Sequence, residues 1–169
     1  LQEAQQHGGK LDIVVDKPEF LRQDLGTTPQ FHAIEISDLN NDSRGDIVVL
    51  FDDLDQNNIS TVGVLLQQPS AGDPTFELSL YRVLCNATAL AIGDLDGDGA
   101  VDIVTGGPAN SLVTIRRGDG QGGFAETIAF ELSKPADRLF IADFDGNGAR
   151  DILSLDLAGS FLGFTSNSP

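Results

Sequence analysis

One acidic stretch occurs three times in this sequence, and its spacing restricts the fold more than any other feature. The three copies read DLNNDSRGDIVV from Asp38, DLDGDGAVDIVT from Asp94 and DFDGNGARDILS from Asp143. Each copy has Asp at positions 1 and 9, Asp or Asn at positions 3 and 5, and an apolar, mostly β-branched run directly after position 9. A repeat of about 50 residues is typical of a chain that uses one supersecondary unit several times.

Short apolar segments surround each acidic stretch, and they have the length and the turn boundaries of β-strands. In one period they are residues 31–39, 45–51, 61–67 and 77–84, and in the next they are residues 88–95, 101–106, 111–118 and 124–132. Gly, Asp, Asn and Pro separate these segments, and no helical period is visible. Four strands in a unit of about 50 residues are typical of a β-propeller blade. The sequence therefore predicts an all-β fold made of blades with four antiparallel strands.

The repeats divide the chain into two complete predicted units and two partial ones. We expect a partial blade at residues 1–30, blades with acidic loops at 31–87 and 88–137, and a partial blade with an acidic loop at 138–169. The first partial unit keeps only the apolar tail, Leu11-Asp12-Ile13-Val14-Val15, so we expect no ion there. Propellers typically have about four to eight blades. About three blades predict an incomplete ring, which further blades of a longer chain or of another subunit would complete.

The acidic stretches have the oxygen donors of a calcium loop. Ca²⁺ takes about six to eight oxygen ligands, and a tight loop with glycines directs alternate side chains toward one centre. The backbone carbonyl of position 7 and the Asp at position 9 would complete the set. The sequence thus predicts up to three Ca²⁺ ions, with these ligands: Asp38, Asn40, Asp42, Arg44 (carbonyl) and Asp46; Asp94, Asp96, Asp98, Ala100 (carbonyl) and Asp102; Asp143, Asp145, Asn147, Ala149 (carbonyl) and Asp151.

Two other interpretations of the loops are less favourable. An EF-hand needs a Glu at position 12 and flanking helices, whereas position 12 is Val49, Thr105 and Ser154 in the three loops. A polar hairpin turn without metal would explain any one loop, but its recurrence with the same acidic positions disfavours that reading. We expect the middle loop, with four Asp, to bind most tightly, because Asn40 and Asn147 lower the charge of the other two.

The segment DLDGDGAVDIVTGGP, with Gly106-Gly107-Pro108 after the apolar run, resembles the FG-GAP repeat of integrin α-subunit propellers and the related repeats of bacterial surface and secreted proteins, the VCBS type. The resemblance implies that each acidic loop binds Ca²⁺ in a hairpin between the first two strands of a blade. It covers about residues 10 to 169. The Gly-Pro tail is absent after the first and third loops.

Several other motifs have weaker interpretations. Arg44-Gly45-Asp46 spells an adhesion tripeptide, but its Asp is position 9 of a calcium loop. The glycine-rich stretch 118–123 precedes a predicted strand, so we interpret it as a hairpin turn and not as a phosphate cradle. We interpret Arg116-Arg117 as a pair on an outer strand. The two histidines lie far apart in sequence, and no catalytic motif is present.

The composition limits the possible partners. A formal net charge of −16 makes nucleic acid and anionic membrane surfaces poor partners, and no apolar stretch approaches the length of a membrane helix. We predict a non-catalytic, calcium-stabilised propeller segment for adhesion or recognition of a protein or glycan, extracellular or on the cell surface, with the periplasm as another location. The alternatives are a propeller portion of a secreted polysaccharide-active enzyme, a lectin, or a structural subunit of a surface assembly. The lack of Trp and the single tyrosine, Tyr81, count against a lectin.

Overall fold

A computed structural model describes residues 30–53, 59–72, 74–83, 86–109, 111–125, 128–159 and 161–165. Within these residues the fold contains strands, turns and loops but no helix, and therefore no helix that could cross a membrane. The strands form three antiparallel sheets that do not close into a barrel, and in each sheet the strands are hydrogen-bonded in sequence order. The predicted all-β fold with antiparallel, incomplete propeller-like blades is confirmed.

The first two sheets have four strands each, and the third has three described strands. The first sheet contains β1 (Gln30–Ser37), β2 (Asp46–Asp53), β3 (Ile59–Gln68) and β4 (Thr75–Arg82). The second contains β5 (Ala89–Gly93), β6 (Asp102–Gly106), β7 (Leu112–Arg116) and β8 (Ile128–Glu131). The third contains β9 (Arg138–Ala142), β10 (Asp151–Asp156) and β11 (Phe161–Thr165). The predicted partial blade at residues 1–30, with its Leu11–Val15 run, lies outside the described residues except for residue 30.

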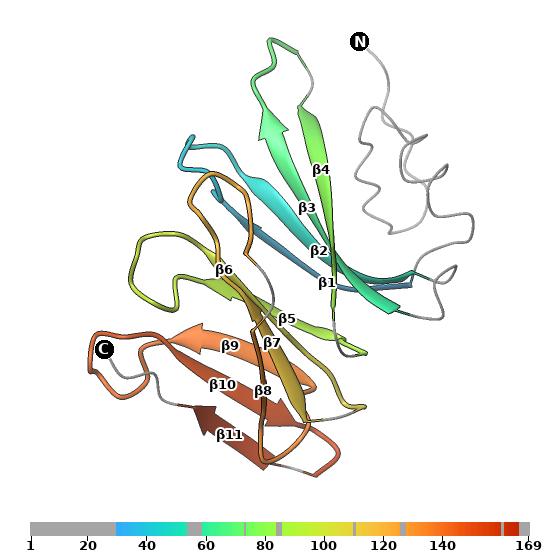
Figure 1. Ribbon diagram of the computed structural model, residues 1–169, viewed down its shortest axis with the longest axis vertical. Helices are drawn as coiled ribbons and strands as arrows, with labels where there is room; N and C mark the ends of the chain where they lie inside the picture. Colours follow the sequence, from blue (N-terminus) through green and yellow to red (C-terminus); the bar gives the residue numbers. More distant parts are fainter. Residues whose placement is uncertain are drawn as a thin grey trace, which may run out of the picture.

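The second sheet lies between the other two, as Figure 1 shows. Its first strand, β5, contacts the first strands of both neighbours, β1 and β9. One apolar cluster fills the space between the first and second sheets, with Val48, Leu50 and Val62 on one side and Leu90 and Ile103 on the other. A second cluster fills the space between the second and third sheets. Its members include Ala91, Val104, Val113, Leu139 and Ile152.

The two residues after the position-9 Asp face opposite sides of their sheet, because side chains alternate along a strand. We call the side toward the preceding sheet the backward face and the side toward the following sheet the forward face. Ile103 packs backward onto the first sheet, and Val104 packs forward onto the third. Val48 likewise packs forward onto the second sheet, and Ile152 packs backward onto it. The apolar run after each acidic loop therefore supplies one residue to each face of its sheet.

Candidate metal-binding loops

Each acidic stretch forms the hairpin loop between the first two strands of a sheet. The loops connect β1 to β2, β5 to β6 and β9 to β10. Positions 4 and 6 have positive φ in all three loops: Asn41 (60°) and Ser43 (66°), Gly97 (78°) and Gly99 (89°), and Gly146 (77°) and Gly148 (89°). Glycine adopts this conformation without a steric cost, and Asn tolerates it better than most residues. The three loops thus share one backbone shape, although the first contains no glycine at these two positions.

The Asp at position 1 holds this shape through hydrogen bonds with backbone amides further along the loop. In the second loop, Asp94 accepts the N–H of Gly97 at 2.8 Å and that of Gly99 at 3.0 Å. Asp143 accepts the equivalent N–H groups of Gly146 at 2.7 Å and Gly148 at 3.0 Å. In the first loop, Asp38 accepts the N–H groups of Asn40, Asp42 and Ser43. The position-1 carboxylate is therefore surrounded by its own loop in each repeat.

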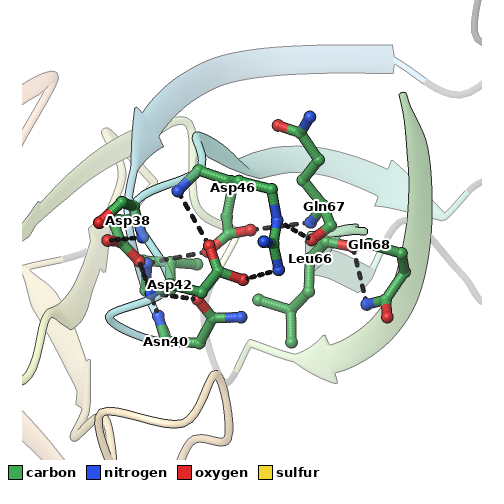
Figure 2. A network of polar contacts seen from close by, with 10 residues as sticks. Asp38, Asn40, Asp42, Asp46, Leu66, Gln67 and Gln68 are labelled. Atoms are coloured by element: carbon green, nitrogen blue, oxygen red, sulfur yellow. Dashed lines mark hydrogen bonds and ion pairs between the residues drawn. The ribbon is translucent and has the colours of Figure 1, made fainter. Parts of the chain in front are cut away.

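Positions 3 and 5 continue the pattern, since each side chain accepts the N–H two residues later. In the first loop, shown in Figure 2, Asn40 accepts from Asp42 at 3.2 Å and Asp42 accepts from Arg44 at 2.9 Å. Asp96 and Asp98 do the same in the second loop, and Asp145 and Asn147 do so in the third. An amide oxygen and a carboxylate oxygen serve equally well here. The exchange of Asp for Asn between repeats therefore changes the charge of a loop but not its shape.

The Asp at position 9 is the first residue of the second strand, and it is buried in every repeat. Its carboxylate accepts the N–H of position 2: Leu39 to Asp46 at 2.9 Å, Leu95 to Asp102 at 2.8 Å, and Phe144 to Asp151 at 2.9 Å. In the first two sheets its other oxygen accepts an N–H from the end of the third strand or just beyond, from Gln67 at 2.8 Å and Gly118 at 2.9 Å. This carboxylate therefore fastens the loop to the sheet.

Two of the loops bring three carboxylates together at one place. Each of Asp94, Asp96 and Asp102 offers an oxygen within 4.8 Å of the others, and Asp143, Asp145 and Asp151 form the same arrangement. Asp98, at position 5 of the second loop, is not part of its group of three. Among the described residues, the three acids of the first loop do not form such a group. A hard cation fits the two clusters, because all their donors are carboxylate oxygens and their like charges need a counter-ion.

Arginines provide part of that counter-charge. In the first loop, the guanidinium of Arg44 pairs with Asp42 and also donates from Nε to the carbonyl of Gln67 at 3.1 Å. In the second loop, Arg117 pairs with Asp96. The outer-strand interpretation of Arg116-Arg117 was wrong: β7 is the third of four strands, flanked by β6 and β8, and Arg117 follows it directly. Sequence reasoning missed Arg117 because 21 residues separate it from Asp96.

Two pKa values in the loops are shifted, in opposite directions. Burial raises the pKa of Asp102, and the charges of Asp96 and Asp98 add to that effect, whereas the N–H groups of Leu95 and Gly118 oppose it. For Asp38, desolvation favours the neutral form. The backbone N–H groups of its loop, those of Ser43 and Asp42 foremost, nevertheless hold its pKa below the usual value. A bound cation would favour the charged form of Asp102 and so oppose this rise in its pKa.

The other motifs do not form a second site. Asp46 of the Arg-Gly-Asp tripeptide is completely buried, so a receptor cannot reach its carboxylate. The stretch 118–123 is a turn in which Asp119 accepts the N–H groups of Gln121 and Gly123. His32 and Ser60 both contact Asp52, at 2.9 Å each, and Ser60 also bonds the backbone of Ala87. In that order the Asp lies between the other two residues, which is not the contact of a nucleophile with its base.

A cavity of about 220 Å³ opens between the second and third sheets. Its lining includes Ile115, Phe130 and Ile152 together with the two arginines Arg117 and Arg150. Among the described residues, no carboxylate, histidine or cysteine side chain lines it.

Comparison with known families agrees with this arrangement. The FG-GAP-like repeat family matches residues 85–154. The match spans the second sheet, β9 and the first part of β10, and it includes two of the three loops. The resemblance to FG-GAP repeats is thereby confirmed for this part of the chain. No curated protein matches the sequence.

Proposed function

We propose that this chain, whose residues 85–154 are FG-GAP-like repeat sequence, is a calcium-stabilised propeller segment that serves adhesion or recognition outside the cell. In this proposal the ions stabilise the hairpins at one end of each sheet. The chain itself performs no catalysis. Its ligand would be a protein or a glycan, bound through loops between the strands, because function in such folds depends on the particular site and not on the fold.

The observation that carries the calcium assignment is the convergence of three carboxylates in each of two loops, with the position-9 Asp buried in both. Without a cation these oxygens repel one another in a partly desolvated place. With three ions bound, each of charge +2, the formal charge of the chain would change from −16 to −10. Calcium suits these loops better than softer metals because the donors are oxygens only.

The three loops differ in charge, and we expect their calcium affinities to differ accordingly. The second loop has four Asp and one neighbouring arginine, whereas the first has three Asp, Asn40 and Arg44. We therefore expect the second loop to bind calcium more tightly than the first, and Asp96→Ala to weaken binding more than Asn40→Ala. Equal effects of the two substitutions in a calorimetric titration would contradict this ranking.

The test of the function uses the full chain after EDTA treatment. We expect calcium to raise the melting temperature by several degrees, and elemental analysis to find bound calcium in untreated protein. Asp94→Asn should reduce the calcium-dependent part of the increase. Asp119→Asn is the matched control, because Asp119 also accepts two turn N–H groups but belongs to no carboxylate cluster. An identical melt with calcium and with EDTA, and no metal in the untreated protein, would reject the calcium assignment.

A lectin or a polysaccharide-active enzyme is the second candidate, and two contacts of Tyr81 count against the lectin. Tyr81 packs edge-on against Phe124 and lies beneath the guanidinium of Arg116, between the first and second sheets. Its ring is therefore already covered and offers no free platform for a sugar. A glycan array combined with an activity screen on polysaccharides distinguishes this candidate from a protein-binding segment.

A further inference from the structure

The glycine-rich stretch at residues 118–123, which we call the glycine turn, is held in one shape by its own hydrogen bonds. Asp119 donates its N–H to the carbonyl of Gly123 at 3.0 Å, and its carboxylate accepts the N–H groups of Gln121 and Gly123. None of these residues is a proposed calcium ligand. Because the bonds fix the backbone of the turn, a contact on one side of it can affect groups on the other side.

One side of the glycine turn contacts the second acidic loop. The N–H of Gly118 donates to the carboxylate of Asp102 at 2.9 Å. A Cβ atom at Gly118 would lie 2.2 Å from the carbonyl oxygen of Val101. A Cβ atom at Gly120 would lie 3.7 Å from the Cβ of Ala100. The turn therefore lies against positions 7, 8 and 9 of the second loop, which include two of its proposed calcium ligands.

The other side of the glycine turn contacts the first loop and its sheet. The side-chain Nδ2 of Asn41 donates to the carbonyl of Gly120 at 3.2 Å. Gly122 is buried, and a Cβ atom there would lie 2.4 Å from the Cδ1 of Leu66. Leu66 directly precedes the residue that donates its N–H to the closing Asp46, as Figure 2 shows. The turn therefore bridges the first two acidic loops.

The residue at position 4 indicates that this bridge is a specific feature of the first loop. Position 4 is Asn41 in the first loop and Gly97 and Gly146 in the other two, and all three residues have positive φ. Glycine takes that conformation without a steric cost, so the shape of the loop does not require an Asn. The amide of Asn41 instead bonds to the glycine turn of the neighbouring sheet. The first loop thus has a side chain at the position from which it reaches the turn.

We propose that the glycine turn couples the first two loops, so that calcium bound by either loop raises the calcium affinity of the other. This rests on the calcium binding proposed above. A cation orders the backbone around Asn41, and the bond from Asn41 then orders the turn, which holds the N–H of Gly118 against Asp102. The second loop consequently loses less conformational freedom when it binds its own cation. A coupling of binding free energies is reciprocal, so the second loop affects the first to the same extent.

Calcium titrations followed by NMR test the coupling in each loop separately. The amide signals of Gly97 and Gly99 report on the second loop, and those of Gly146 and Gly148 report on the third. Asn41→Gly removes the bond to the glycine turn and introduces the residue that the other two loops have at position 4. It should lower the calcium affinity of the second loop by about threefold, as expected for the loss of one exposed hydrogen bond, and leave that of the third loop unchanged.

Two further variants show whether the effect passes through Asn41. Ser43→Gly is the matched control, because it places a glycine at the other positive-φ position of the first loop and leaves the contact of Asn41 in place. It should not lower the calcium affinity of the second loop. Asp42→Ala removes a proposed ligand of the first loop. It should weaken calcium binding by the second loop in the wild-type background by a similar factor, but not in the Asn41→Gly background.

The possible results separate the coupling from the calcium assignment. An unchanged calcium affinity of the second loop in Asn41→Gly overturns the coupling while calcium binding stands. An equal loss in Ser43→Gly, or an equal effect of Asp42→Ala in both backgrounds, overturns it in the same way. If calcium shifts none of the glycine signals, the calcium assignment fails and the coupling fails with it.

Discussion

The substitution Asp102→Asn separates the structural role of a loop carboxylate from its role toward a metal. Asp102 is 1% exposed, and its two oxygens accept different backbone N–H groups, from Leu95 at 2.8 Å and from Gly118 at 2.9 Å. Asn has the same shape but only one oxygen. Its NH₂ group would therefore face one of the two N–H donors, and that donor would stay buried without an acceptor.

The expected cost follows from these two hydrogen bonds. The variant loses one charge-assisted hydrogen bond and leaves a buried donor unsatisfied, which together cost about 2–3 kcal/mol. Asp96 and Asp98 repel the buried charge of Asp102, so removal of that charge offsets part of this cost. We therefore expect a net loss of about 2 kcal/mol, which for a chain of this length lowers the melting temperature by roughly 4–8 °C.

The assay is thermal unfolding in EDTA, where no calcium contributes. Asp98→Asn is the control, because the third loop has Asn147 at the equivalent position. The side chain of Asn147 accepts the N–H of the residue two positions later, as that of Asp98 does. In EDTA the control should melt within about 1 °C of the wild type. In calcium its melting temperature should be lower than that of the wild type. The reasoning is refuted if Asp102→Asn melts like the wild type in EDTA, or if the two variants lose the same amount.

Three further predictions concern the charge and the backbone of the loops. Arg117→Leu removes the cation beside Asp96, so calcium affinity measured by titration should increase by roughly fivefold, about 1 kcal/mol for a partly exposed pair. Ser43→Gly removes a side chain at φ 66° and should stabilise the chain by about 1 kcal/mol in a denaturant titration. The raised pKa of Asp102 means that the metal-free folded state binds its proton more tightly than the unfolded state does. The contribution of this protonation to the free energy of unfolding is therefore fully present below pH 3.8, the usual pKa of Asp. It is lost as the pH rises through the pKa of Asp102 in the folded state. The melting temperature in EDTA should accordingly fall less for Asp102→Asn than for the wild type as the pH is raised above 3.8.

The fold could be predicted because its determinants are local in sequence. The Asp and Gly positions of a loop, and the alternation of the residues after it, lie within about a dozen residues of one another. Ile103 and Val104 follow Asp102 directly, so their opposite faces follow from strand geometry alone. The sequence predicts the conformation of the first loop less directly, since Asn41 and Ser43 take positive φ without being glycine. Only the comparison with the other two repeats reveals that conformation in the sequence.

The contacts that could not be predicted join residues from different strands. Arg117 reaches Asp96 because β6 and β7 pair with Ile103 opposite Arg116, a register that the sequence does not specify. The same register brings the N–H of Gly118 to Asp102. Spacing alone therefore indicates only a metal ligand at position 9. The structure adds that this carboxylate also fastens the loop to its sheet.

The first loop lies outside the residues that match the family, and its position-9 Asp has the same two hydrogen-bond roles. It precedes residues 85–154, yet Asp46 accepts the N–H groups of Leu39 and Gln67 just as Asp102 accepts those of Leu95 and Gly118. The loop keeps this geometry although Asn40 stands at position 3 in place of an Asp, and although Arg44 already pairs with Asp42. The hydrogen bonds at position 9 therefore hold the hairpin in shape independently of the number of charges around it. In the proposed calcium-binding loops, affinity can therefore change from repeat to repeat through positions 3, 5 and 7, while the blade that presents the loops stays the same.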